Sequence, residues 1–253
     1  MSKIKVKTKK EIELIRSAGA LAAETLVRAG EMCKPGISTL EIDDFIGEYT
    51  KKHGGVSACL GYYGYPRYAC ISINEVVCHG IPSKETILKD GDIVNIDITT
   101  ILSGYHGDCS AMFCVGNVSK EARELVDTAK LCLEEGIRAA AMPKARFSDI
   151  GCAIQPIADE HGFSVVEDYC GHGIGRGFHE EPNVLHYANS ERTPIIEIGN
   201  VFTIEPMINA GKPGTKTLGD GWTAVTVDGR LSAQWEHTMV KTKDGIDILT
   251  LPR

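Results

Sequence analysis

Residues 91–97 read Gly-Asp-Ile-Val-Asn-Ile-Asp, and residues 199–205 read Gly-Asn-Val-Phe-Thr-Ile-Glu. Each heptapeptide is an apolar run of the kind found in buried strands, and each ends on a carboxylate, Asp97 or Glu205. Because the polar positions match along with the apolar ones, the pair indicates that one structural unit occurs twice. A carboxylate at the end of a buried strand is costly unless its charge is compensated, so both residues are candidates for a shared site.

The sequence around these heptapeptides repeats as well. Eight positions from Glu11 to Ser38 carry the same residue 110 positions later. His79 and His179 each open a His-x-x-Pro sequence. Two copies with this period are too few and too long for a solenoid. We therefore expect a duplicated, pseudo-two-fold α+β unit that forms a single catalytic domain over 1–253, with related halves at about 1–118 and 119–253.

Capping boxes predict where two helices begin. Thr8 with Glu11 predicts a helix to about Cys33, and Ser38 with Glu41 predicts one that ends near residue 53. The matching helices of the second half are expected at 120–141 and 148–161. Strands are expected at 69–76, 93–102, 105–115, 201–208, 223–227, 233–241 and 246–249.

The composition is that of a globular protein. Of the 253 residues, 43% are hydrophobic and 24% are charged, which excludes disorder as the main architecture. The net charge of −7 argues against a dedicated nucleic-acid binder, so no specific DNA partner is expected. Nine scattered cysteines without a Cys-x-x-Cys pair are typical of free thiols in a reducing cytoplasm, and they argue against a redox protein. The chain shows no signal peptide and no apolar run that would cross a membrane.

Two further carboxylates follow the matched pair. Asp108 lies in the next expected strand of the first half, and Glu236 lies in the last long strand of the second. Pseudo-symmetry would bring all four carboxylates to the centre, where their repulsion requires cations. His172, flanked by glycines and without a counterpart in the first half, is the expected nitrogen ligand. Such donors suit Mn, Fe, Co or Zn, and two bridged ions would hold a hydroxide.

A set of ordered motifs closely resembles bacterial type I methionine aminopeptidases of the M24 metallopeptidase family, over essentially the whole chain. The motifs are CLGYYGYP at 59–66, SINEVVCHGIP at 72–82, NID at 95–97, HGD at 106–108, GHGIG at 171–175, TIEP at 203–206 and QWEHT at 234–238. The resemblance implies the duplicated pita-bread fold. It also implies removal of the initiator methionine from nascent proteins whose second residue is small.

The resemblance further implies a metal-ligand set. Two divalent ions (Co, Mn, Fe or Zn) are expected, with Asp108 and Glu236 bridging them. His172 and Glu205 would complete one site, and Asp97 the other. A weaker match implies a site for Na or K at Asn74, Val76 and Ser232.

Roles in catalysis and binding are implied in the same way. Hydrolysis by the metal-bridging hydroxide is expected, with Glu205 as proton shuttle. His79 would contact the amide-nitrogen side of the scissile bond, and His179 the carbonyl oxygen. The expected methionine pocket consists of Cys59, Tyr62, Tyr65, Cys70, Phe178 and Trp222. Plain core packing is the alternative for the two cysteines.

Other functions stay open at this stage. A prolidase or proline-specific aminopeptidase would keep the fold, but those enzymes usually carry a large additional N-terminal domain. A metal-free binding module would be marked by loss of a ligand, and all five ligands are present. The expected partners are nascent polypeptide N-termini, and a monomer is expected from the family. The lysines at 3, 5, 7, 9 and 10 could contact phosphates of ribosomal RNA, although a solvated helix start is the favoured interpretation.

Overall fold

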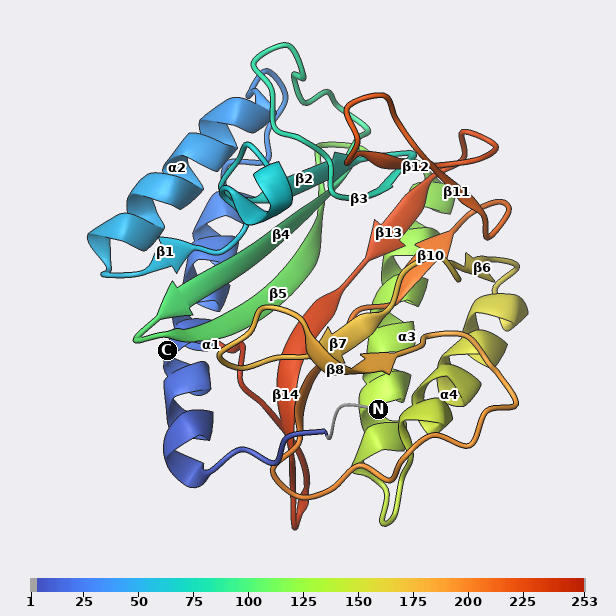
Figure 1. The fold of residues 1–253 in the computed structure, drawn as a ribbon. Helices are drawn as coiled ribbons and strands as arrows, with labels where there is room; N and C mark the ends of the chain where they lie inside the picture. The colour runs from blue at the N-terminus through green and yellow to red at the C-terminus, as the bar shows by residue number, and fades with distance from the viewer. Residues whose placement is uncertain (1–3, 253) are drawn as a thin grey trace.

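Two helix pairs of matching length repeat along the chain in the computed structural model, which describes residues 4–252 (Figure 1). Helix α1 (Lys9–Gly30) and helix α3 (Lys120–Ala141) each have 22 residues. Helix α2 (Thr39–Lys52) and helix α4 (Phe147–Glu160) each have 14. The equal lengths agree with the duplication predicted from the sequence.

The ends of the helices follow the predicted caps closely in the first half. The hydroxyls of Thr8 and Ser38 accept the amides of Glu11 and Glu41, which confirms both capping boxes. Helix α1 ends at Gly30, three residues before its predicted end. Helix α4 begins one residue before its predicted start, and two acceptors cap it: Asp149 Oδ2 accepts the Arg146 amide at 2.8 Å, and Thr193 Oγ1 accepts the Ser148 amide at 2.7 Å.

A nine-stranded sheet passes through both halves. Its strands follow the order β1-β4-β5-β14-β9-β7-β8, while β2 pairs with β4 and β15 pairs with β14. The antiparallel pairing of β5 with β14 joins the halves, through Glu236 opposite Ser110 and His237 opposite Cys109. The strands are β1 (Val56–Ser57), β2 (Cys70–Ile73), β4 (Ile93–Leu102), β5 (Tyr105–Cys114), β7 (Gly171–Gly173), β8 (Glu180–Val184), β9 (Val201–Ile204), β14 (Glu236–Thr242) and β15 (Gly245–Ile248).

Two three-stranded sheets and one short helix complete the structure. One sheet has the order β13-β10-β6, and the other has the order β11-β12-β3. The 3₁₀ helix η1 covers Tyr62–Gly64. The strands are β3 (Val76–Cys78), β6 (Ser164–Val165), β10 (Met207–Asn209), β11 (Thr215–Thr217), β12 (Ala224–Thr226) and β13 (Ser232–Gln234).

Three strands that were predicted as continuous are broken. The predicted strand 69–76 turns at Asn74, whose φ is 55°, between β2 and β3. The predicted strand 201–208 is interrupted at residues 205–206, where Pro206 has no amide to donate to a sheet. The predicted strand 233–241 breaks at Trp235, between β13 and β14. Each break redirects the chain, and Glu205 and Glu236 lie at two of them.

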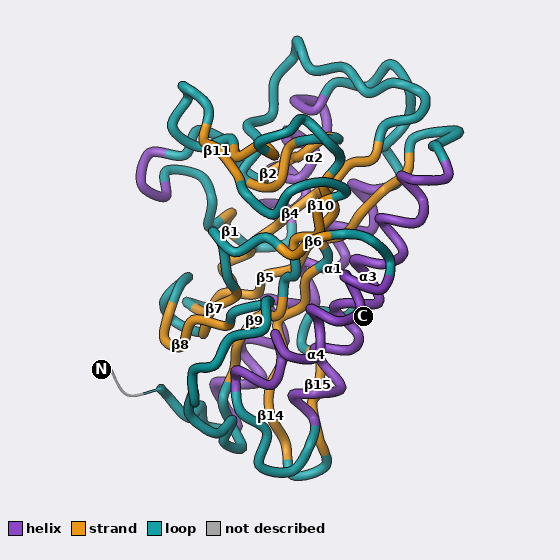
Figure 2. The backbone as a smooth tube through the Cα atoms, turned by 90° about the vertical axis from the view of Figure 1, so that its right-hand side faces the viewer, coloured by secondary structure: helices purple, strands orange, loops and turns teal. Residues whose placement is uncertain are grey.

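Each helix pair covers its own part of the hydrophobic core. Ile42 and Ile46 of α2 pack in a buried cluster with Ile96 and Ile98 of β4. In the second half, Phe147 packs edge-on against Phe202. Figure 2 shows α3 and α4 on one side of the strands and β7 and β8 toward the other. No helix among residues 4–252 is long and apolar enough to cross a membrane.

Candidate metal centre and substrate pocket

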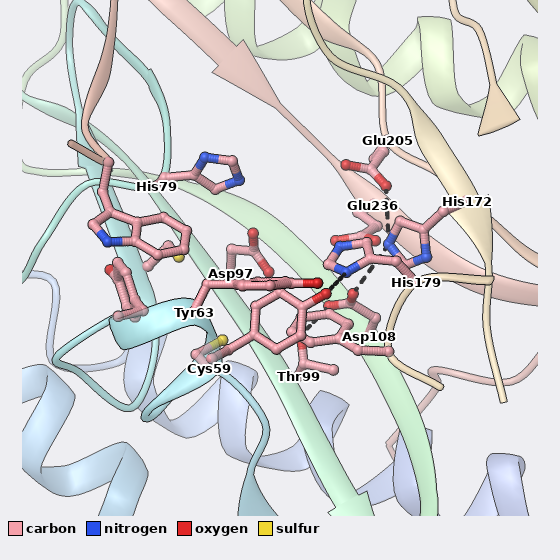
Figure 3. Close-up of a pocket in the computed structure, with 15 residues that line it drawn as sticks. Cys59, Tyr63, His79, Asp97, Thr99, Asp108, His172, His179, Glu205 and Glu236 are labelled. Atoms are coloured by element: carbon pink, nitrogen blue, oxygen red, sulfur yellow. Dashed lines mark hydrogen bonds and ion pairs between the residues drawn. The ribbon is translucent and has the colours of Figure 1, made fainter. Parts of the chain in front are cut away.

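One cavity of about 210 Å³ brings together every residue predicted as a metal ligand, catalytic group or part of the methionine pocket (Figure 3). These thirteen are Cys59, Tyr62, Tyr65, Cys70, His79, Asp97, Asp108, His172, Phe178, His179, Glu205, Trp222 and Glu236. Tyr63 and Thr99 also line the cavity, and the sequence analysis missed both. Residues that lie far apart in the sequence therefore form one site.

A buried cluster of carboxylates and one imidazole forms the floor of the cavity. His172 Nε2 lies 3.6 Å from Asp108 Oδ2 and 3.7 Å from Glu205 Oε1. Asp108, His172 and Glu236 each offer a ligand atom, and these atoms lie within 4.8 Å of one another. Asp97 opposes Ser110 across the β4–β5 pair, which places it on the strand next to Asp108.

Burial and mutual repulsion make this cluster costly without a cation. Burial, followed by the charge of Asp108, raises the pKa of Asp97 and of Glu236 well above the usual range. Burial also raises the pKa of Glu205 to about 7, although His172 opposes this shift. Burial disfavours the charged form of His172, but Asp108 and Glu205 prevail and raise its pKa.

The donor atoms fit divalent metal ions. Glu236 Oε1 is buried and has no hydrogen-bond partner among the described residues. Coordination to a cation would compensate this buried oxygen. Carboxylates together with one imidazole form a ligand set for Mn, Fe, Co or Zn. The positive charge would also offset the repulsion that raises the carboxylate pKa values.

Neighbouring side chains orient the carboxylates. Thr99 Oγ1 donates to Asp108 Oδ1 at 2.8 Å, and Thr203 Oγ1 donates to Glu205 Oε1 at 2.7 Å. The amide of Glu205 donates to His186 Nε2 at 3.0 Å, so His186 lies beside the cluster and holds the backbone of Glu205. The strand period of two could have indicated the threonines, because each lies two residues from a predicted ligand and hence on the same face.

The two predicted catalytic histidines lie on different sides of the cluster (Figure 3). His79 has a φ of 56°, and burial lowers its pKa. His179 Nδ1 lies 2.7 Å from the hydroxyl of Tyr62, and its ring lies 4.2 Å from that of His172. Partial burial and then the His172 charge lower the pKa of His179. Both shifts favour the neutral imidazole.

A pocket of sulfur and aromatic groups adjoins the cluster. Cys59, Tyr65 and Cys70 form a buried group, against which Phe178 and Trp222 pack. The Tyr65 hydroxyl donates to Gly80 O at 2.9 Å, so its ring rather than its polar end is free to face a ligand. The hydrogen bond with Cys59, together with burial, raises the pKa of the Cys70 thiol, which argues against a nucleophilic role.

The predicted monovalent-cation residues are partly brought together. The amide of Ser232 donates to the carbonyl of Asn74 at 2.8 Å. Ser232 Oγ is buried and has no hydrogen-bond partner in residues 4–252. Val76 begins β3, two residues after Asn74. The Na or K site stays a prediction.

The N-terminal lysines differ from one another. Lys3 lies outside the described residues, while Lys5, Lys9 and Lys10 are exposed. The interpretation as a solvated helix start is wrong for Lys7, whose side chain is only 6% exposed. Its ammonium lies 2.6 Å from Glu180 Oε2, so the charge is paired within the protein.

Comparisons with known proteins agree with this geometry. Residues 13–243 match the profile of metallopeptidase family M24. The chain is 52% identical to the methionine aminopeptidase of Escherichia coli strain K12, over 98% of this chain and 94% of that protein. It is 51% identical to methionine aminopeptidase A of Synechocystis, over 96% of each chain.

Solved structures give the same result for the fold. The methionine aminopeptidase from Rickettsia prowazekii superposes with a TM-score of 0.95 at 46% identity, covering 98% of this chain and 100% of that one. A prolidase from Pyrococcus furiosus has a TM-score of 0.77 at 23% identity, and the match covers 98% of this chain and 66% of the prolidase. The second likeness is evidence for the pita-bread fold alone.

Proposed function

The chain belongs to metallopeptidase family M24, and from that premise we infer that it is an aminopeptidase that removes an N-terminal methionine. The observation that carries this inference is one cavity in which a buried carboxylate–histidine cluster adjoins a pocket of thiols and aromatic rings. The identity of about one half to methionine aminopeptidases along nearly the whole chain supports it. A prolidase function is less well supported, because that likeness is confined to the fold.

The pocket suits a methionine side chain. A thioether is flexible and polarisable, and it interacts favourably with the edges of aromatic rings. Tyr65 and Trp222 meet edge to face with ring centroids 5.2 Å apart, next to Cys59 and Cys70. Cys70 lies directly opposite Asp97 in the β2–β4 pair. A methionine side chain bound in the pocket would therefore bring the substrate backbone next to the carboxylates.

Five residues would hold divalent metal. Their ligand atoms would come from Asp97, Asp108, His172, Glu205 and Glu236. When bound, such ions polarise a peptide carbonyl and lower the pKa of a coordinated water. Co, Mn, Fe and Zn all suit these donors.

The protein's own groups would then move protons and orient the substrate. Glu205 would accept a proton from the attacking water and deliver it toward the leaving amine. The hydrogen bond from Thr203 Oγ1 to Glu205 Oε1, at 2.7 Å, would orient the carboxylate for this transfer. Neutral His179 would donate to the carbonyl oxygen, with Tyr62 fixing its ring from the other nitrogen. Neutral His79 would contact the amide-nitrogen side of the bond.

The same walls would select the substrate. His79 and His179 line the cavity beside the methionine pocket, and we propose that crowding there excludes a bulky second residue. The substrates would be nascent chains in the cytoplasm, processed by a monomer. Exposed Lys5, Lys9 and Lys10 leave a ribosome contact as a further prediction.

Methionine release from Met-Ala-Ser tests the function. Protein stripped of metal would be titrated with Mn(II) or Co(II), and Glu205→Gln would be assayed beside it. We expect metal-dependent release by the wild type and a loss of at least about 1,000-fold in the variant. Glu160→Gln, which changes an exposed carboxylate at the end of α4, is the control. No release by folded, metal-bound protein would contradict the proposal, and cleavage of Xaa-Pro peptides instead would favour a prolidase.

A further inference from the structure

The segment before α1 is attached to the strand that leads into the site. Val6 forms an antiparallel bridge with Asn200, and the amide of Lys7 donates to Gly199 O at 2.8 Å. The side chain of Asn200 donates to Lys5 O at 3.3 Å. These contacts fix the backbone at Lys7 and aim its side chain inward.

Lys7 forms a shielded ion pair with the residue that follows His179. Its Nζ lies 2.6 Å from Glu180 Oε2, and the two side chains are only 6% and 11% exposed. Withdrawing both charges from water is costly, and replacing such pairs with apolar groups is often neutral or stabilising. An apolar pair of similar size would therefore stabilise the fold about as well. What distinguishes the Lys7–Glu180 pair is how it holds the backbone around it.

The pair acts on the loop that carries two residues of the cavity. Glu180 Oε1 accepts the amide of Gly177 at 3.0 Å, so one carboxylate joins Lys7 to residues 175–179. Lys7 also packs on Gly175, where an added Cβ would lie 2.4 Å from Nζ. The loop is held from the opposite side by His106, whose amide donates to Gly175 O at 2.8 Å.

The side chains beyond this loop depend on its position. The ring of Phe178 stacks on His179 with centroids 4.3 Å apart, and His179 lies 4.2 Å from His172. Within residues 4–252, the side chain of His179 forms one hydrogen bond, with Tyr62. Its orientation therefore relies on the backbone that Glu180 holds.

We propose that Lys7 is a positioning residue: through its ion pair with Glu180 it fixes loop 175–179 and so aims His179 and Phe178 at the bound substrate. The proposal rests on the proposed aminopeptidase function. It assigns a role to the N-terminal segment, which lies outside the cavity.

The test compares Lys7→Met with Lys5→Met. Lys5 belongs to the same segment and lies 3.7 Å from the same carboxylate, but its side chain is 68% exposed. We expect Lys7→Met to lower kcat for Met-Ala-Ser by about 10- to 100-fold, because a displacement of about 1 Å in a catalytic group has that effect. Affinity for Mn(II) should stay within about twofold, and Lys5→Met should behave as wild type.

Two further measurements separate positioning from folding. Glu180→Gln keeps an oxygen for the Gly177 amide but places an NH2 group where Oε2 accepts from Lys7, which breaks the pair, and we expect it to lower kcat in the same way. The double variant should then be no slower than the slower single variant, since both act through one pair. The ring signal of His179 in NMR, identified by its loss in His179→Ala, should shift in Lys7→Met and not in Lys5→Met.

Unchanged kcat and an unshifted His179 signal in folded Lys7→Met would overturn the proposal. So would equal losses in the Lys5 and Lys7 variants, which would indicate a general charge effect. If the wild type releases no methionine, the aminopeptidase function fails, while the His179 signal still decides whether Lys7 positions the loop.

Discussion

Two adjacent threonines in β4 differ in what their hydroxyl groups contact. Thr99 lines the cavity and donates to Asp108, while the next residue, Thr100, points to the other face of the sheet. Thr100 is fully buried, and its hydroxyl has no hydrogen-bond partner in the described part of the chain. The same Thr→Val substitution at the two positions therefore removes a bond to Asp108, a proposed metal ligand, only at position 99.

Thr99→Val should weaken metal binding by about 10- to 100-fold, because losing the hydrogen-bond partner of a metal ligand typically lowers metal affinity by that factor. Thr100→Val removes an unsatisfied hydroxyl and should leave binding unchanged, with stability equal or higher. Calorimetric titration with Mn(II) measures both. Equal affinities in the two variants would show that the Asp108 contact is unimportant.

Asp43 provides a pH-dependent test away from the metal cluster. Its Oδ1 accepts the amides of Tyr68 and Ala69, both at 2.9 Å, just before β2. Burial nevertheless raises its pKa to about 6, because it outweighs those bonds. A folded pKa above the unfolded value means that the residue's contribution is intact below about pH 4 and is lost as pH rises through 6.

Between pH 4.5 and 8 the wild type should therefore lose about 2 kcal/mol of stability relative to Asp43→Asn, because about 1.5 pH units separate 4.5 from the folded pKa and each unit corresponds to 1.36 kcal/mol. Urea unfolding at several pH values measures the difference. Asp44→Asn alters the exposed neighbour on α2 and should follow the wild-type profile. Parallel profiles for wild type and Asp43→Asn would contradict the raised pKa.

At the level of elements, the sequence predicted the helices better than the strands. Capping boxes are local signals, so the starts of α1 and α2 could be predicted from neighbouring residues. The α4 cap is local only in part, because Asp149 accepts the Arg146 amide while Thr193, which accepts the Ser148 amide, is supplied by a distant loop. Apolar runs indicated strands at 201–208 and 233–241 but gave no sign that each would break beside Glu205 or Glu236. Such breaks depend on which strand pairs with which, a property of the whole sheet.

Lys241 ties the last long strand to a helix. It lies on β14, and its Nζ donates to the carbonyls of Ala140, Ala141 and Met142 at 2.7, 2.8 and 3.0 Å. Without Lys241, the carbonyls of Ala140 and Ala141 at the end of α3 would lose this donor, while Met142 O would keep its bond from the Ala145 amide. A buried cation at this end also interacts favourably with the helix dipole.

Lys241→Met should lower the free energy of unfolding by about 2–4 kcal/mol, because the carbonyls of Ala140 and Ala141 lose a charged donor. Lys243→Met removes the same group from an exposed position two residues later and should change stability by less than about 0.5 kcal/mol. Urea denaturation of both variants is the measurement. A negligible effect at Lys241 would mean that water replaces its bonds.

At the scale of the whole molecule, the site lies where the proposed halves meet. Asp97 and Asp108 come from the first, and His172, Glu205 and Glu236 come from the second. The strands that join them, β5 and β14, pair through Glu236 itself. Pseudo-symmetry predicted this convergence from the matched heptapeptides. It could not predict Thr99, Tyr63 or the Lys7–Glu180 pair, because these have no matched partner in the other half.

Because the proposed ligands come from both sides of that junction, bound metal should stabilise the protein as a unit. In its absence, repulsion among buried carboxylates opposes folding, as the raised pKa values of Asp97 and Glu236 indicate. Mn(II) at about 100 times its dissociation constant should add about 2.7 kcal/mol. For a chain of this size that corresponds to a rise of about 5–10 °C in Tm.

Differential scanning calorimetry with EDTA and then with excess Mn(II) measures this shift. Glu236→Gln provides the decisive comparison, because it removes one charge from the cluster and one proposed ligand. Its metal-free form should melt above the metal-free wild type, since the repulsion falls, while its response to Mn(II) should be smaller. A variant that is less stable without metal and responds fully to Mn(II) would show that Glu236 neither repels its neighbours nor binds the ion.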